Sequence, residues 1–113
     1  MYSIQEAFDN KKYKIDSDYS YENDGIGHYE AYGVKGFNKG VDYIIGQILF
    51  VFEGLDSTDK EIEDFIENSE DEITQESKSF IHSENAKDFE IDYFCPNDNI
   101  IKVRFQYFIY NLK

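Results

Sequence analysis

The chain has 113 residues, with 24 Asp and Glu against 11 Lys and Arg, which gives a formal net charge of -13 at pH 7. This length fits a single domain, residues 1–113, and excludes a barrel enzyme or a two-domain dinucleotide-binding fold. The acidity argues against direct binding to nucleic acid or to anionic membranes, because both are bound through clusters of Lys and Arg. The apolar share of 41% still predicts a folded core.

The cysteine content and the N-terminus favour a cytoplasmic protein. Cys95 is the only cysteine, so an internal disulfide is excluded. The first twelve residues mix charged and polar side chains and contain no apolar leader segment. The longest apolar stretch, residues 41–52, is shorter than the roughly 20 residues that span a membrane. We therefore expect a soluble protein that has no contact with a membrane.

The first half of the chain predicts a short helix and then three strands. Ser3 and Glu6 have the spacing of a capping box, which predicts a helix over about residues 4–11. Strict alternation predicts a half-buried strand over 13–22, and a second strand follows over 28–34. Residues 41–53 are apolar on both faces, which is typical of a central strand that is covered on each side.

The second half predicts one helical segment and two strands. Thr58 and Glu61 form a second capping box, and Ile62, Phe65, Ile66 and Ile73 recur at helical spacing. We expect a helix over 58–68 that continues to about residue 81, with a candidate break at Asn68-Ser69. Alternation then predicts strands over 89–95 and 101–109, joined by a turn over 96–99.

These elements predict an α+β domain in the order α-β-β-β-α-β-β. The expected architecture is an antiparallel sheet of about five strands with the helix packed against it and a short N-terminal helix.

The predicted second helix is strongly acidic. Between Glu53 and Glu76 lie eleven of the 24 acidic residues, and Lys60 is the only base in that stretch. Because the apolar stripe must face the sheet, the acids are expected to face solvent. Like charges at i and i+4 cost a helix a few tenths of a kcal/mol per pair, so they do not serve helix stability. The candidate partner-binding acids are Asp59, Glu63, Glu67, Glu70 and Asp71.

The spacing of these acids suggests what they could bind. Four residues of helix rise about 6 Å, which is comparable with the spacing of phosphates along a nucleic-acid strand, ~3.4 Å of axis each. Such a face could occupy a groove built for a phosphate backbone and would be steered quickly onto a basic partner. The alternative is a solvated face that only keeps the protein soluble.

In size, charge, lack of a leader segment and possession of an acidic helix, the chain resembles small acidic inhibitor proteins. These include phage anti-CRISPR and other anti-defence proteins, and immunity proteins that neutralise nuclease toxins. The resemblance implies a cytoplasmic nucleic-acid mimic whose partner is a nuclease or a CRISPR effector. It rests on no aligned motif, so it transfers no site residue to this chain.

Tyrosines provide a second candidate for partner contact. The chain has 10 Tyr and no Trp, and several of the tyrosines fall in the first predicted strands. Tyr is favoured at interfaces because it combines a large contact area with a polar tip. We select Tyr19 and Tyr21 as contact residues, interleaved with acids that would suit an Arg-rich partner. The alternative is that these rings line the edge of the core.

No motif predicts catalysis, a metal or a cofactor. Asp16 and Asp18 begin like a calcium loop, but the Gly and Glu positions of that loop are not filled. His28, His82 and Cys95 are too far apart to give the short ligand pairs of a zinc site. Cys95 also falls on an alternating apolar face, where we expect a buried, structural thiol.

The leading hypothesis from the sequence is a non-catalytic inhibitor that covers the basic, nucleic-acid-binding surface of another protein. One alternative is a structural or accessory domain that forms a homo-oligomer to cover its sheet. Another is a small enzyme or ligand-binding domain in which a deep pocket gathers His28 or Cys95 with acids. The sequence does not separate an immunity protein from a phage anti-defence protein.

Overall fold

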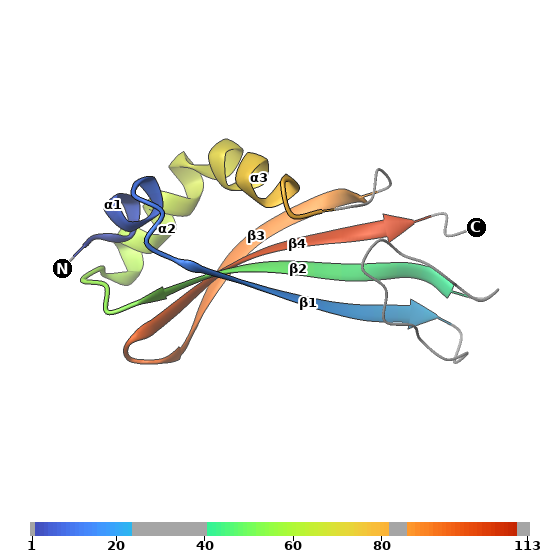
Figure 1. Ribbon diagram of the computed structural model, residues 1–113, viewed down its shortest axis with the longest axis horizontal. Helices are drawn as coiled ribbons and strands as arrows, with labels where there is room; N and C mark the ends of the chain where they lie inside the picture. Colours follow the sequence, from blue (N-terminus) through green and yellow to red (C-terminus); the bar gives the residue numbers. More distant parts are fainter. Residues whose placement is uncertain (1, 24–40, 82–85, 111–113) are drawn as a thin grey trace.

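The computed structural model describes residues 2–23, 41–81 and 86–110, and within its strands the side chains of residues 14–16, 45–53, 86–97 and 100–108. Four antiparallel strands form one sheet in the order β1-β2-β4-β3, and three helices lie on one of its faces (Figure 1). The α+β class is therefore confirmed, whereas the predicted strand over 28–34, and with it the fifth strand, lies outside the described residues. The elements are α1 (Ile4–Asp9), β1 (Lys14–Asn23), β2 (Val41–Glu53), α2 (Asp59–Asn68), α3 (Glu70–Lys78), β3 (Ala86–Asn97) and β4 (Ile100–Tyr110).

The N-terminal helix begins where the capping box predicts and ends early. The Ser3 hydroxyl accepts a hydrogen bond from the backbone N–H of Glu6 at 3.3 Å, which fixes the start of α1. Lys11 has a φ of 53°, in the left-handed region that an α-helix cannot continue through. The helix predicted over 4–11 therefore ends at Asp9, and the chain turns directly into β1.

β2 is one of the two inner strands of the described sheet, which agrees with the central position that its two apolar faces predict. It pairs with β1 on one side and with β4 on the other, so that Phe50 lies between Ile15 and Val103. Ile48, Phe50 and Phe52 point to the same face and are all fully buried. This face carries the helices.

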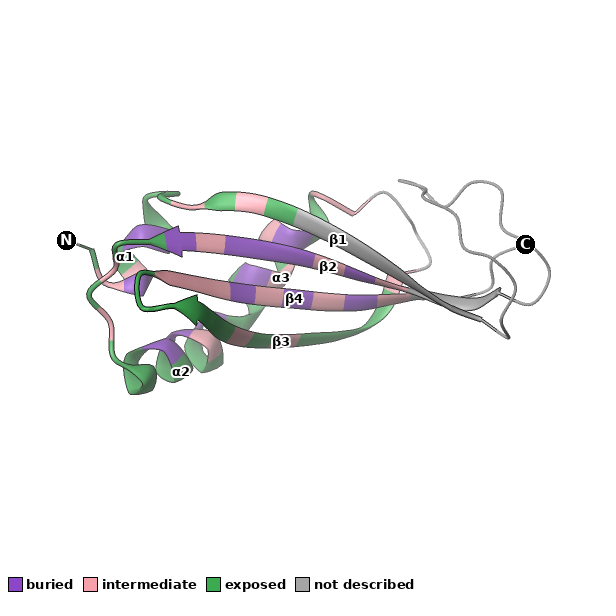
Figure 2. Ribbon diagram, turned by 90° about the horizontal axis from the view of Figure 1, so that it is seen from below, coloured by how far each residue is buried: buried purple, intermediate pink, exposed green. Residues whose placement is uncertain are grey.

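The opposite face of the sheet carries none of the described helices (Figure 2). Its centre is Leu49, which lies between Asp16 of β1 and Arg104 of β4 and is 7% exposed. Arg104 in turn pairs through its guanidinium with Asp92 of β3. The expected cover on both faces of β2 is therefore found on one face only within the described residues. Polar and charged cross-strand neighbours surround the apolar side chains of the other face.

The last two strands form a hairpin that is longer than predicted. β3 and β4 are joined by a turn of two residues, Asp98 and Asn99. The register shifts twice along β3, next to Asp88, whose φ is 55°, and between Phe94 and Asn97. Such irregularities twist an exposed strand and leave extra residues unpaired. They make β3 an irregular strand at the edge of the sheet.

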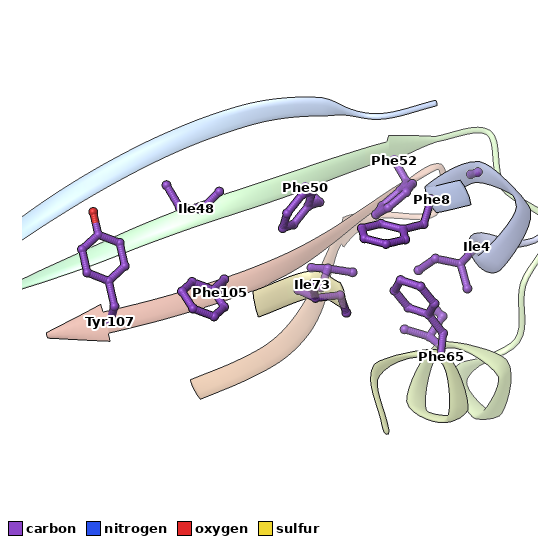
Figure 3. Packing of buried hydrophobic residues seen from close by; sticks show 12 residues of the cluster. Ile4, Phe8, Ile48, Phe50, Phe52, Phe65, Ile73, Phe105 and Tyr107 are labelled. Carbon is purple, nitrogen blue, oxygen red and sulfur yellow. The ribbon is translucent and has the colours of Figure 1, made fainter. Parts of the chain in front are cut away.

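The core lies between the helices and the covered sheet face, and its centre is aromatic (Figure 3). Phe65 of α2 and Ile73 of α3 are buried against it, as the apolar stripe predicts. Ile4 and Phe8 of α1 complete the cluster from the N-terminal side. The helices are thus held by their apolar faces, and their polar faces are left outside.

Gly46 is required by a ring that crosses it. Gly46 of β2 pairs with Tyr107 of β4, and a Cβ atom at Gly46 would lie only 2.1 Å from the Cζ atom of Tyr107. Tyr107 is 1% exposed, so its ring has no solvent into which it could move. The glycine in this otherwise apolar strand is therefore a packing requirement and not a break in the strand.

We predict that Gly46→Ala lowers the free energy of unfolding by about 1–3 kcal/mol, the usual cost of overpacking a core. Urea denaturation followed by circular dichroism measures this loss. In a Tyr107→Leu background the side chain that crosses position 46 is shorter, so Gly46→Ala should lower the free energy of unfolding by less. Equal costs in the two backgrounds would show that Tyr107 is not the cause.

Candidate functional site

The candidate site is the solvent face of α2 and α3. α2 starts at a capping box in which the Thr58 hydroxyl accepts from the N–H of Glu61 at 3.3 Å, and the Glu61 carboxylate accepts from the N–H of Thr58 at 3.2 Å. The cap fixes the rotation of the first turn. Ile62 and Phe65 then face the core and Asp59 and Glu63 face out.

The break between the two helices lies at Ser69, within the Asn68-Ser69 position that the sequence suggests. Ser69 is 3% exposed, and its hydroxyl donates to the Gln5 side chain of α1 at 3.2 Å. Its ψ of 17° departs from helical geometry, and α3 restarts at Glu70. Figure 1 shows the axes of α2 and α3 at an angle to each other. The acidic row therefore runs over two helices and is not one straight ladder.

All five acids that the sequence selects are exposed. Asp59, Glu63 and Glu67 follow each other along α2, and Glu70 and Asp71 lie in the first turn of α3. Negative side chains in a first helical turn are favoured by the helix dipole, which offsets part of the repulsion within the row.

Other acids of these helices already bind groups within the fold. Glu61 caps α2, Asp64 lies 3.5 Å from the Nζ atom of Lys60, and Glu76 binds Lys11. Within residues 2–23, 41–81 and 86–110, the remaining acids of the two helices have no Lys or Arg partner. They are Asp59, Glu63, Glu67, Glu70, Asp71 and Glu72. Five of these six are the acids that the sequence selects.

Glu76 joins α3 to the segment between α1 and β1. Both of its carboxylate oxygens lie 3.2 Å from the Nζ atom of Lys11, and the Tyr13 hydroxyl donates to it at 3.0 Å. Burial raises the pKa of the Tyr13 phenol above its ordinary value, and the hydrogen bond to Glu76 raises it further. The bond to the same carboxylate raises the pKa of Lys11. The sequence does not predict this triad, because no local pattern joins residues more than sixty positions apart.

The first acids of α2 lie beside the edge strand of the sheet. Burial raises the pKa of the Tyr93 phenol of β3, and the negative charges of Asp59 and Glu63 raise it further. Asp59 also lines a hollow of about 420 Å³ between the start of α2 and the β3–β4 turn. The N-terminal end of the acidic row therefore adjoins a concave surface.

For the predicted tyrosines the structure describes the backbone only. The side chains of Tyr19 and Tyr21 lie outside the described residues, and their backbones in β1 pair with Gly46 and Ile44. β1 and β3 are at opposite edges of the described sheet, separated by three inter-strand steps of about 4.8 Å each. A contribution of the two tyrosines to binding stays a prediction.

Of the three residues considered as zinc ligands, only Cys95 belongs to the described part of the chain. His28 and His82 lie outside the described residues. Cys95 is exposed near the end of β3, so the expected buried thiol is wrong; the register shift after Phe94 carries this part of the strand away from the covered core. In the described ranges no three His, Cys, Asp or Glu side chains are grouped so that they could hold a metal ion.

None of the described helices is both long and apolar enough to cross a membrane.

Comparison of the chain with known protein families, with curated proteins and with solved structures finds no match in any of the three.

The Glu76 triad predicts a loss of stability at alkaline pH. Groups whose pKa is raised by folding contribute stability in full below their unfolded pKa, and this stability is lost as the pH rises through the folded value. For Tyr13 and Lys11 the loss begins above the ordinary values of 10.0 and 10.5. We expect urea midpoints between about pH 8 and pH 11 to fall less steeply in Tyr13→Phe than in the unsubstituted protein.

Tyr2→Phe is the matched control, because Tyr2 is 43% exposed near the N-terminus and is not part of the triad. It should keep the slope of the unsubstituted protein. If Tyr13→Phe kept the same slope as well, the triad would not be the source of the alkaline loss.

Proposed function

We propose that this protein is a non-catalytic, cytoplasmic inhibitor that covers the basic, nucleic-acid-binding surface of another protein. The observation that carries the proposal is the division of the acids on α2 and α3. Those that the fold uses are paired, while Asp59, Glu63, Glu67, Glu70 and Asp71 are exposed and have no cationic partner among the described residues. A basic partner would supply the missing counter-charges.

The unpaired acids carry a cost that a partner would remove. Glu63 repels Glu67, and Glu67 and Asp71 are also four residues apart, across the break at Ser69. Each such i, i+4 pair within a regular helix is destabilising by a few tenths of a kcal/mol. A cationic groove on the partner would offset the repulsion between these acids. It would also accelerate association of the two proteins through long-range attraction. Partners of this chemistry include nucleases and CRISPR effectors, so the proposal covers both immunity proteins and phage anti-CRISPR proteins.

The break at Ser69 limits the similarity to nucleic acid. Only Asp59, Glu63 and Glu67 lie on one straight helix, with a rise of about 6 Å from each to the next. Glu70 and Asp71 follow on a helix of different direction (Figure 1). The acidic surface therefore fits a bent or wide cationic groove better than a straight phosphate track.

One observation favours an accessory domain that forms homo-oligomers. The sheet face opposite the helices exposes Phe94 at 39% and presents Val51 between Lys14 and Lys102. Other features of the sheet argue against such an oligomer. The charged rows of this face and the irregular, proline-containing edge strand β3 both oppose association with a second sheet. Sedimentation at several concentrations separates the two functions, since a stable homo-oligomer would favour the accessory domain.

We predict that Glu63→Lys/Glu67→Lys weakens binding to the partner about tenfold to a hundredfold. An exposed ion pair contributes about 0.2–1 kcal/mol, and charge reversal turns two attractions into repulsions. Reversal of Glu70 and Asp71 in addition should abolish binding. The partner is obtained by capture from the native host at low salt. It should be a basic protein that is released at high salt and whose binding to nucleic acid is blocked by the unsubstituted chain.

Asp16→Lys/Glu90→Lys is the control, because it changes the net charge by the same amount on the opposite face of the sheet. It should retain most of the binding, and circular dichroism should show both variants folded. Undiminished binding by the helix variant, or equal loss in both variants, would contradict the assignment of the site to α2 and α3.

A further inference from the structure

The hollow next to the first turn of α2 is lined by apolar as well as acidic side chains, whereas the acidic row consists of acids alone. It measures about 420 Å³ and lies between the β2–α2 connection and the tip of the β3–β4 hairpin. Four of its lining residues are apolar, namely Leu55, Ile62, Pro96 and Ile101. The rest are polar or acidic, namely Ser57, Asp59, Cys95, Asn97, Asp98 and Asn99.

The two carboxylates of the hollow are contributed by different elements. Asp59 opens α2 and Asp98 is in the hairpin turn, and both are exposed. No Lys or Arg is among the residues that line the hollow, and neither carboxylate pairs with a Lys or Arg elsewhere in the described part of the chain. The Asn97 side chain is already engaged, because it accepts from the N–H of Asn99 at 3.0 Å and holds the turn in shape.

The combination of apolar and acidic lining residues indicates which chemical groups could bind in the hollow. Two carboxylates disfavour an anion, although α2 begins here, and the described residues include no group of three metal ligands. An apolar wall with acids suits a long side chain that has an apolar stem and a cationic end. Of the two candidates, the guanidinium of arginine is planar and weakly hydrated, so it can lie on an apolar wall while it donates to carboxylates.

We infer that the hollow receives an arginine side chain of the basic partner, with its stem against Ile62 and Ile101 and its guanidinium between Asp59 and Asp98. This inference rests on the proposed function and adds an anchoring position to it. The hollow continues the acidic row of α2 at the N-terminal end, since Asp59 belongs to both. A partner held along Glu63 and Glu67 would therefore bring cationic side chains directly to it.

Cys95 provides a probe of occupancy, because it is the only cysteine of the chain and it lines the hollow. The experiment uses the full chain with an oligoarginine peptide and measures the alkylation rate of Cys95 by a neutral maleimide. Fluorescence anisotropy of the labelled peptide measures binding in parallel. With peptide at ten times its dissociation constant, we expect alkylation to slow about tenfold, since about one hollow in eleven is then empty.

A peptide that only lies near the acids leaves the Cys95 sulfur uncovered, so it would not slow the alkylation. Asp59→Asn/Asp98→Asn should weaken binding of the peptide and should lose the protection even at ten times its own dissociation constant, whereas Asp16→Asn/Glu90→Gln should keep both. Each variant is compared with itself with and without peptide, which removes differences in intrinsic reactivity.

The outcomes separate the two proposals. Binding without protection of Cys95, or protection that survives Asp59→Asn/Asp98→Asn, would overturn the inference and leave the proposed function standing. Equal protection by an oligolysine peptide of the same length would overturn the preference for arginine. Absence of oligoarginine binding at low salt would count against both the hollow and the acidic surface.

Discussion

Phe8 lies where the helices meet the sheet, and its ring is in contact with aromatic rings of three other elements or segments. Its centroid is 5.3 Å from that of Phe65 in α2, 5.9 Å from that of Phe50 in β2 and 5.7 Å from that of Tyr13 just before β1. Aromatic pairs in edge-to-face or stacked geometry add about 0.5–1.5 kcal/mol each beyond the area they bury. This contact fixes which side of α2 is buried, and therefore which side carries the acids.

The acidic surface follows from that orientation together with the ion pairs of the fold. Once Ile62 and Phe65 are buried, Asp59, Glu63 and Glu67 lie on the exposed side of α2. No Lys or Arg of the described residues forms an ion pair with them. Lys60 pairs with Asp64 and Lys11 with Glu76, and Lys14 lies 3.6 Å from Glu53 of the sheet. The negative charge of the chain is thus partly neutralised in the fold and partly concentrated on one surface.

On the sheet face opposite the helices, Arg104 is the centre of a group of polar and aromatic contacts. Arg104 forms two hydrogen bonds with Asp92 and lies with its guanidinium carbon 5.6 Å from the centroid of the Phe94 ring. Its stem runs beside Leu49, so this apolar position is nearly enclosed although none of the described helices covers that face.

The sequence by itself determined the elements that depend on nearby residues. Capping boxes at Ser3 and Thr58, the alternation over 13–22, 89–95 and 101–109 and the 3.6-residue stripe of α2 act over two to four positions, and each predicted an element that the described residues contain. The exposure of the five selected acids followed from the same periodicity. The break at Ser69 was visible only as a candidate, because burial against Gln5 of α1 settles it.

Only the tertiary structure decided what depends on distant residues. It paired Glu76 with Lys11 and Tyr13, placed Tyr107 across Gly46, exposed Cys95 and brought Asp98 to the same hollow as Asp59. These contacts join residues from about 40 to more than 60 positions apart, and they depend on strand register and on how the helices cross the sheet. Periodicity shows which side of an element is buried. The path of the chain determines which element it meets, and so which charges remain free to bind a partner.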